Sequence, residues 1–170
     1  IYGPEVALET LRRLHDRGVD ARLTLAGQDK GSESLCRRRT EELGLGGAVR
    51  FPGFLDAAAK VRELAVHDLY LHTNRVDNTP VSVLEAAASG LPVVAAAVGG
   101  VPDLLGDAGI LVPADDPDAA ADAITSLVGS PEETRRLSRA GRALAEKSAW
   151  PRVHERWREL FRELGLEEAS

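Results

Sequence analysis

The segment from Asp77 to Glu85 combines two carboxylates with a helix start, and no other part of the chain suggests chemistry as clearly. Asn78-Thr79-Pro80 resembles a loop that begins a helix, because threonine is favoured as N-cap and proline at the first helical position. The backbone N–H groups of residues 81–83 are then predicted to have no partner within the helix. With the positive end of the helix dipole, these groups favour an anion such as phosphate.

The two acids flank this predicted anion site, and a carboxylate is unsuited to bind the anion itself. Ser82 adds a hydroxyl to the first turn, and Glu85 follows three residues later on the same helix face. We expect Glu85 to accept hydrogen bonds from neighbouring hydroxyls, such as those of a ribose. Asp77 is placed to accept hydroxyls from the other end of the same ligand. The alternative interpretation is that acids near a helix start serve only the dipole.

The residues that follow place this site at the edge of a sheet. Small side chains at 86–89 let the helix lie close to a sheet, Gly90 ends the helix, and Pro92 prevents its continuation. Val93–Ala96 is an apolar run typical of a buried strand. The predicted site therefore lies at the carboxyl end of the preceding strand, Asp68–His72, where open parallel sheets bind ligands.

In these residues the chain resembles the retaining glycosyltransferases of the GT-B fold, in the family-4-like group also called glycosyl transferases group 1. Their fingerprint is an acid, seven residues and a glutamate, followed by a small-residue helix, Gly-Leu-Pro-Val-Val and a Gly-Gly loop. The matching residues here are Asp77, Glu85, Gly90–Val94, Val98–Asp103, Gly106–Pro113 and Asp116-Pro117, and Phe51–Phe54 matches the family's segment near the nucleotide base.

The resemblance implies a role for each matched position. It places Asp77 against the sugar of a nucleotide-sugar donor, the backbone of Pro80–Ser82 against the diphosphate, and Glu85 against the ribose. The predicted catalytic residues are Asp77 and Glu85, and the predicted donor-binding residues are Asn78, Thr79, Pro80, Val81, Ser82, Val83, Phe51, Pro52 and Gly53. We expect no metal and no other cofactor, because the resemblance implies an enzyme of a group that usually needs none.

The chain departs from the family pattern at the groups that contact the sugar and the phosphates. The first acid is usually glutamate, and Asp77 is one methylene shorter, so Asn78 is expected to share its task. The family's phosphate-clamping arginine would precede Ile1, and the position of its lysine is occupied by Tyr2. Lysines at 30 and 60 are available to replace that lysine, and the alternative is that both are solvated surface charges.

Predicted strands alternate with predicted helices along the whole chain. The strands are expected at Ala21–Ala26, Ala48–Phe51, Leu69–His72, Pro92–Ala96 and Gly109–Val112, and helix starts at Gly3-Pro4, Ser32 or Ser34, Asp56, Thr79, Asp116, Ser130 and Ser148. This order predicts an α/β fold with a doubly wound, mostly parallel, Rossmann-like sheet and C-terminal helices. It corresponds to one half of a GT-B fold.

The length of 170 residues suits one domain, which we expect to be the nucleotide-sugar-binding domain of an N-terminally truncated chain. Trp150, Trp157 and Phe161 belong to an apolar stripe at helical spacing within about residues 148–165. The resemblance implies that this terminal helix crosses to the missing N-terminal domain.

Composition excludes several classes of protein. The net charge of −6 argues against a nucleic-acid partner. The single Cys36 forms no intrachain disulfide and fits a reducing compartment. No apolar stretch is long enough to span a bilayer, so we expect a cytoplasmic location, with contact to the inner face of the membrane only through the missing half.

His72 ends a predicted strand beside the site. Its side chain either contacts a ligand or serves only packing or solvent contact.

These observations favour the donor-binding half of a retaining glycosyltransferase, with the acceptor bound by the missing domain and the isolated fragment inactive. One alternative is a nucleotide-sugar epimerase or phosphorylase on the same fold, and another is a non-enzymatic doubly wound interaction domain. The spacing of Asp77 and Glu85 favours the transferase. A phosphoacceptor domain would need an acidic cluster at the strand ends, which residues 25–27 and 109–112 do not supply.

Overall fold

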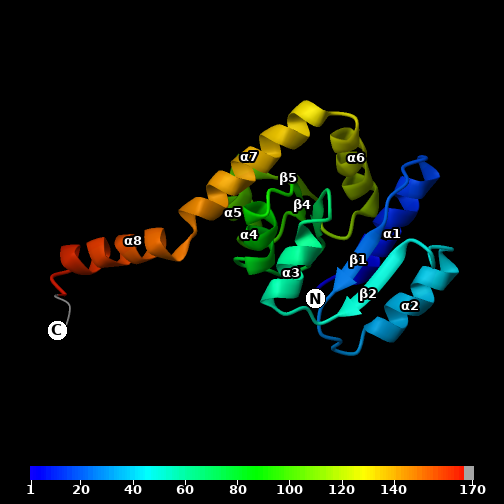
Figure 1. The fold of residues 1–170 in the computed structure, drawn as a ribbon, viewed down its shortest axis with the longest axis horizontal. Helices are drawn as coiled ribbons and strands as arrows, with labels where there is room; N and C mark the ends of the chain where they lie inside the picture. The colour runs from blue at the N-terminus through cyan, green and yellow to red at the C-terminus, as the bar shows by residue number, and fades with distance from the viewer. Residues whose placement is uncertain (167–170) are drawn as a thin grey trace.

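The computed structural model describes residues 1–166, in which helices and parallel strands alternate (Figure 1). In chain order the elements are α1 Pro4–Asp16, β1 Leu23–Ala26, α2 Glu33–Glu42, β2 Val49–Gly53, α3 Ala57–Leu64, β3 Tyr70–His72, α4 Val81–Ala88, β4 Val93–Ala96, α5 Val101–Leu105, a 3₁₀ turn Gly106–Ala108, β5 Ile110–Val112, α6 Pro117–Val128, α7 Pro131–Lys147 and α8 Trp150–Glu163. The predicted α/β class is confirmed.

Three helices begin where capping residues predict. Asp56, Asp116 and Ser130 each accept a hydrogen bond from the backbone N–H three residues later, at 2.7, 2.8 and 3.4 Å. The prediction that Ser148 caps the last helix is wrong. Ser148 ends α7, and the cap position of α8 is Ala149, whose side chain has no group that can accept a hydrogen bond.

Strand β4 lies at the centre of the core, and all four of its residues are buried. Val94 packs with residues of α1, β5, α6 and α7 on one face of the sheet. Val93 and Ala95 pack with Val83 of α4 and Val101 of α5 on the other face. Because side chains alternate along a strand, this division puts helices on both faces, as a doubly wound fold requires.

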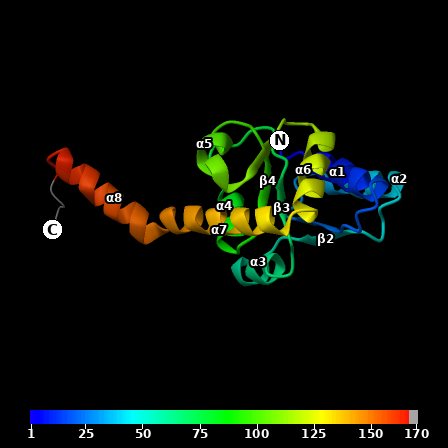
Figure 2. The same ribbon diagram turned by 90° about the horizontal axis from the view of Figure 1, so that it is seen from above.

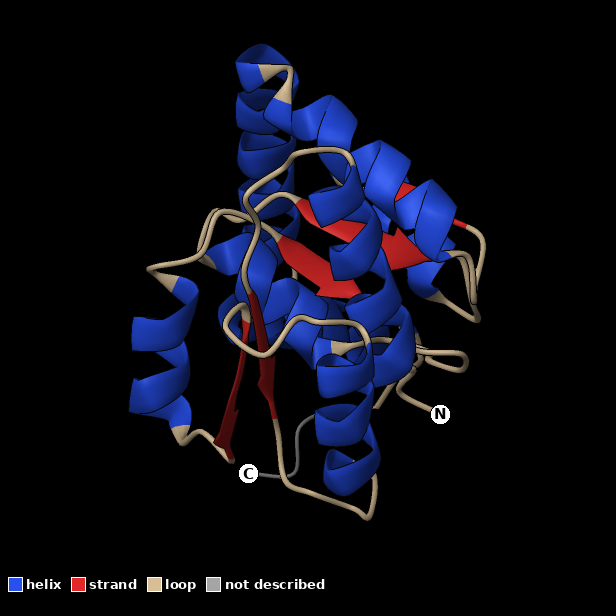
Figure 3. Ribbon diagram, turned by 90° about the vertical axis from the view of Figure 1, so that its right-hand side faces the viewer, coloured by secondary structure: helices blue, strands red, loops and turns tan. Residues whose placement is uncertain are grey.

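The strands form two parallel ladders, β1–β2 and β3–β4–β5, rather than the single sheet expected from the sequence (Figure 3). The ladder is interrupted between β1 and β3, whose residues line the same open cavity of about 1750 Å³. The expectation of parallel strands is confirmed, and the expectation of one continuous ladder is not met, since β1 and β3 share this cavity but no ladder hydrogen bonds.

A pair of glycines supports the loop that follows β3. Gly99 has a φ of +50°, and a Cβ atom added there would overlap the carbonyl oxygen of Asp77. A Cβ on Gly100 would overlap the carbonyl oxygen of Asn78, and the Gly100 N–H donates to the Asp77 carbonyl at 3.2 Å. The Gly-Gly loop after β4 therefore lies directly against the backbone that carries the first predicted acid.

The two C-terminal helices differ in what they contact. Helix α7 packs on α4, and its Ser138 hydroxyl donates to the carbonyl of Gly90 at 2.6 Å. Helix α8 has no buried residue and projects beyond the rest of the domain (Figures 1 and 2). Its contact with another domain stays a prediction. No helix within residues 1–166 has both the length and the apolar character needed to cross a membrane.

The Gly99→Ala variant tests the close contact between the two loops. We expect the free energy of unfolding to fall by about 2 to 4 kcal/mol, because alanine must adopt a left-handed conformation and also displace the Asp77 carbonyl. Urea unfolding followed by circular dichroism measures this change.

The matched control is Gly46→Ala. Gly46 lies in a turn, its φ is not in the left-handed region, and an added Cβ meets no atom within 4 Å. We expect Gly46→Ala to change the free energy of unfolding by less than about 0.5 kcal/mol. A similar loss of stability in both variants would contradict the proposed loop contact.

Candidate functional site

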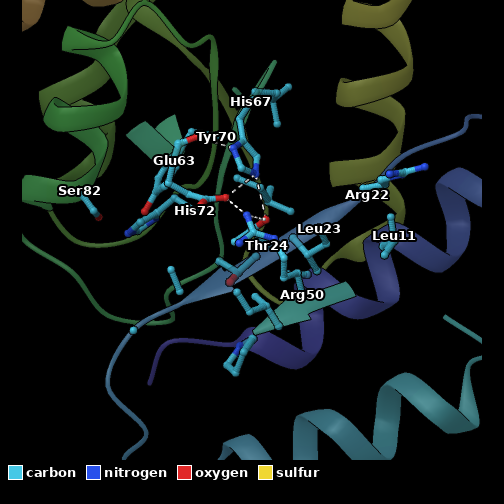
Figure 4. Close-up of a pocket in the computed structure, with 18 of the residues that line it drawn as sticks. Leu11, Arg22, Leu23, Thr24, Arg50, Glu63, His67, Tyr70, His72 and Ser82 are labelled. Carbon is cyan, nitrogen blue, oxygen red and sulfur yellow. Dashed lines mark hydrogen bonds and ion pairs between the residues drawn. The ribbon is translucent and has the colours of Figure 1, made fainter. Parts of the chain in front are cut away.

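Most of the predicted site residues lie on the wall of the cavity between β1 and β3. Figure 4 shows Ser82 of this set, together with Tyr70 and His72 of β3. From the segment after β3 the cavity is lined by Asp77, Thr79, Pro80, Val81, Ser82 and Glu85, and from β3 itself by Tyr70, Leu71 and His72. Asn78 is exposed and does not line it. The structure therefore brings the two acids and the helix start to one surface.

The start of α4 differs by one residue from the prediction. Thr79 is not the N-cap: Pro80 takes that position with an extended ψ of 109°, and no side chain caps the helix. Val83 is also not free, because its N–H donates to the Pro80 carbonyl at 3.1 Å and its side chain is fully buried. The N–H groups of Val81 and Ser82 have no acceptor among residues 1–166.

The first turn of α4 is open. Val81 is 64% exposed and Ser82 is partly exposed, so this turn lies at the surface of the described chain. They point along the axis at the positive end of an eight-residue helix that no side chain caps. This is the arrangement that the sequence predicts for anion binding, reduced from three donors to two.

Tyr70 joins the site from β3, and the sequence analysis did not identify it. Tyr70 and His72 alternate with Leu71, so both face the side of the sheet that carries α4. Burial raises the pKa of the Tyr70 hydroxyl above its usual value, a hydrogen bond with Ser82 opposes this effect, and the charges of Glu85 and Asp77 add to it. The Tyr70 hydroxyl therefore stays protonated at neutral pH.

Glu85 lines the cavity, and it is paired with a lysine. The Lys60 ammonium of α3 lies 2.6 Å from Oε1 of Glu85, and the two side chains are 40% and 36% exposed. Oε2 of Glu85 has no hydrogen-bond partner within residues 1–166. Lys60 is therefore paired with a predicted site residue, and its role as the phosphate cation stays a prediction.

Asp77 is held by two side chains that precede it. Asn74 donates from Nδ2 to Asp77 Oδ2 at 2.6 Å, and His72 Nε2 lies 3.2 Å from the same oxygen. Neither contact was expected from the sequence, which suggested only that His72 lies beside the site. No local sequence signal identifies these contacts, because they depend on how the loop folds back.

The segment expected near the nucleotide base ends strand β2. Phe51 lines the cavity, and the Arg37 guanidinium lies 4.5 Å from the centre of its ring. Pro52 and Gly53 are partly exposed at the end of the strand and do not line the cavity. Contact between a base and Phe51–Gly53 stays a prediction.

The N-terminal residues also reach this cavity. Tyr2 lines it, and the Lys30 ammonium lies 5.9 Å from the centre of the Tyr2 ring. Lys30 lines the cavity as well. The second candidate for the missing phosphate cation is thus placed beside the residue that occupies the family's lysine position, and Lys60 is the lysine in contact with a predicted site residue.

Parallel strands, helices on both faces, and an uncapped helix start between two acids define an α/β domain of the Rossmann-like class with an open helix start at its strand ends. The family model for glycosyl transferases group 1 matches residues 2–144. The chain belongs to this family, as its motifs suggested, and the match favours the transferase over a non-enzymatic interaction domain.

Known proteins agree with this assignment. The chain is 34% identical over 150 residues to the GDP-mannose-dependent alpha-(1-6)-phosphatidylinositol dimannoside mannosyltransferase of Mycobacterium tuberculosis, covering 86% of this chain and 37% of the relative. It spans 29% of the length of one curated relative and 41% of another, so it corresponds to well under half of such proteins.

Two solved structures show the same fold. The C-terminal domain of the group 1 glycosyltransferase LpcC from Francisella tularensis superposes with a TM-score of 0.74 at 18% identity, covering 86% of this chain and 78% of that one. Anabaena HepE in complex with UDP-glucose gives a TM-score of 0.76 at 22% identity, covering 86% and 41%. The fold is therefore one half of a GT-B glycosyltransferase.

The Lys60→Gln variant tests whether the ion pair with Glu85 stabilises the fold or only places a positive charge beside the cavity. We expect the free energy of unfolding to fall by less than about 1 kcal/mol, because both side chains are more than a third exposed and water screens the pair. Urea unfolding followed by circular dichroism measures the difference.

The control is Arg38→Gln, which removes a more exposed pair with Glu42, at 3.9 Å, outside the cavity. The two variants should have similar stability. A loss above about 2 kcal/mol in Lys60→Gln alone would show that the pair is part of the folded framework.

Proposed function

We propose that this chain is the donor-binding half of a retaining glycosyltransferase that moves a sugar from a nucleotide-diphosphate sugar to an acceptor. The single observation that carries the proposal is the open start of α4. Two N–H groups without acceptors, those of Val81 and Ser82, lie between Asp77 and Glu85 on the wall of one cavity.

The donor would bind along this wall with its diphosphate at the helix start. The backbone of Pro80–Ser82 would face the phosphates, where the N–H groups and the dipole favour negative charge. Oε2 of Glu85 would accept a ribose hydroxyl, and Asp77 would accept hydroxyls of the transferred sugar. The base would lie toward Phe51–Gly53 at the end of β2.

Lys60 supplies the positive charge that the family pattern places elsewhere. Its ammonium pairs with Glu85, which lies three residues beyond Ser82 on the same helix face. A lysine side chain has four rotatable bonds, so this group would reach from the ribose carboxylate toward the neighbouring phosphate. We therefore assign to Lys60 the neutralisation of the diphosphate in this half of the enzyme.

Transfer with retention requires the acceptor oxygen to bond to the anomeric carbon on the face from which the diphosphate departs. The bond between the anomeric carbon and the phosphate oxygen breaks, and its electron pair stays on the diphosphate. The proton of the acceptor hydroxyl passes to that leaving group. The α4 donors and Lys60 would stabilise the charge that develops there, which is the main contribution this half can make.

The acceptor would be bound by another part of the enzyme, so we expect no transfer by these 170 residues alone. The relative from Mycobacterium tuberculosis and the Anabaena structure carry GDP-mannose and UDP-glucose in their names. These two donors are the first to test here. We place the enzyme in the cytoplasm, with contact to the inner face of the membrane made only by the other half.

The proposal is tested by measuring thermal stabilisation with UDP-, GDP-, ADP- and dTDP-sugars. A donor present at ten times its dissociation constant should raise the free energy of unfolding by about 1.4 kcal/mol. The Glu85→Ala variant should lose this stabilisation while keeping its circular dichroism spectrum, because Glu85 contacts the ligand and is only partly buried. Isothermal titration would confirm the loss of affinity.

The control is Glu41→Ala, which removes an exposed carboxylate of α2 that does not line the cavity. It should respond to the donor like the unaltered chain. If no nucleotide sugar stabilises the unaltered chain, or if Glu85→Ala responds fully, donor binding at this helix start is ruled out.

A further inference from the structure

His72, at the end of β3, is a buried polar side chain whose burial local packing does not explain. Among residues 1–166 the buried polar side chains are Thr10, Thr40 and His72. The two threonine hydroxyls donate to carbonyls one turn back in their own helices, at 2.8 Å each. His72 is 3% exposed and instead reaches a carboxylate on the next loop.

The contacts of His72 and Asn74 meet on one oxygen. His72 Nε2 lies 3.2 Å from Asp77 Oδ2, and Asn74 Nδ2 donates to that oxygen at 2.6 Å. Oδ1 of Asp77 has no hydrogen-bond partner within residues 1–166. The carboxylate is therefore fixed through one oxygen, and the other is available to accept hydrogen bonds from a ligand.

The contact with Asp77 determines which nitrogen of His72 carries the proton. A carboxylate oxygen only accepts, so Nε2 must donate. In the neutral ring Nδ1 is then an acceptor, and it is buried without a partner within residues 1–166. The other tautomer would bury an unpaired N–H at Nδ1 and oppose two lone pairs at Nε2, which is less favourable.

The unpaired Nδ1 argues against a role in packing alone. An apolar side chain would fill the same position of β3, opposite the small Ala95, without burying an unsatisfied nitrogen. What histidine adds, and leucine or valine cannot, is a donor rigidly aimed at Asp77. Buried polar groups of this kind that do not serve the core are concentrated at functional sites.

We propose that His72 and Asn74 are positioning residues that hold Asp77 by Oδ2 and leave Oδ1 to bind hydroxyls of the donor sugar. This inference rests on the proposed function and extends it to the residues that set how Asp77 is presented. It also accounts for the shorter acid, since an aspartate with two donors on one oxygen is fixed in place with one fewer rotatable bond than a glutamate.

The test compares the affinity of the 170-residue chain for UDP with UDP-glucose, and for GDP with GDP-mannose, by isothermal titration. His72→Leu removes the donor and keeps the volume. We expect it to weaken binding of the nucleotide sugar that the unaltered chain prefers by about tenfold, because one hydrogen-bonded contact with the sugar loses its geometry. Binding of the matching nucleotide diphosphate, which depends on α4, should change less than about twofold.

Conservative variants separate positioning from a general structural role. His72→Gln places an amide N–H close to the position of Nε2 and should restore most of the affinity for the nucleotide sugar. His72→Asn places its amide near the position of Nδ1, too far from Asp77, and should behave like His72→Leu. Asn74→Ala should give a loss in the same direction. The ¹⁵N NMR signals of His72 should show a protonated Nε2 and an unprotonated Nδ1.

Each alternative result overturns a definite claim. Equal weakening of nucleotide and nucleotide sugar in His72→Leu would make His72 structural and would overturn the positioning role alone. No change in either affinity, or an Nδ1-protonated tautomer, would also overturn that role. If the unaltered chain binds neither nucleotides nor nucleotide sugars, the proposed function fails, and the role of His72 in sugar binding fails with it.

Discussion

The register between β3 and β4 is the constraint on which the site depends. Tyr70 lies opposite Val93 and His72 opposite Ala95, so the two polar side chains of β3 face α4. A slip of one residue would turn both to the other face of the sheet and put Leu71 in their place. The register is fixed because β4 is buried on both faces and each face has its own apolar cluster.

Several unpaired polar groups gather on the wall that this register creates. Within residues 1–166 they are the N–H groups of Val81 and Ser82, Oδ1 of Asp77 and Oε2 of Glu85, with the buried Nδ1 of His72 behind them. Outside this wall, capping and side-chain hydrogen bonds satisfy many of the described polar groups, as at the starts of α3, α6 and α7. Groups on an open wall can be hydrated, and without partners in the described protein they remain available to a ligand.

Much of the fold could be predicted because its signals are local. Asp56, Asp116 and Ser130 cap the helices expected of them, and the apolar run Val93–Ala96 is the buried strand. The error at Thr79 also has a local cause. Proline fixes φ near −65°, a value shared by helical and extended backbone, so the sequence does not show whether Pro80 is the first helical residue or the one before it.

The contacts that shape the site could not be predicted in the same way. Lys60 and Glu85 are 25 residues apart on different helices, and their pairing depends on how α3 and α4 pack. The break between the two ladders is equally non-local, since alternation of strands and helices predicts parallel strands but not which edges meet. His72 and Asp77 are close in sequence, but their contact depends on a loop held in place by Gly99 and Gly100.

The position of helix α8 determines what optical methods can observe. The chain has two tryptophans, Trp150 and Trp157, and both lie on α8, 70% and 49% exposed. The aromatic rings near them, His154 and Phe161, belong to the same helix. Intrinsic tryptophan fluorescence therefore reports the surroundings of this projecting helix. It should respond little to unfolding of the sheet or to a ligand in the cavity. A shift of that emission to shorter wavelength would instead signal that something has covered α8.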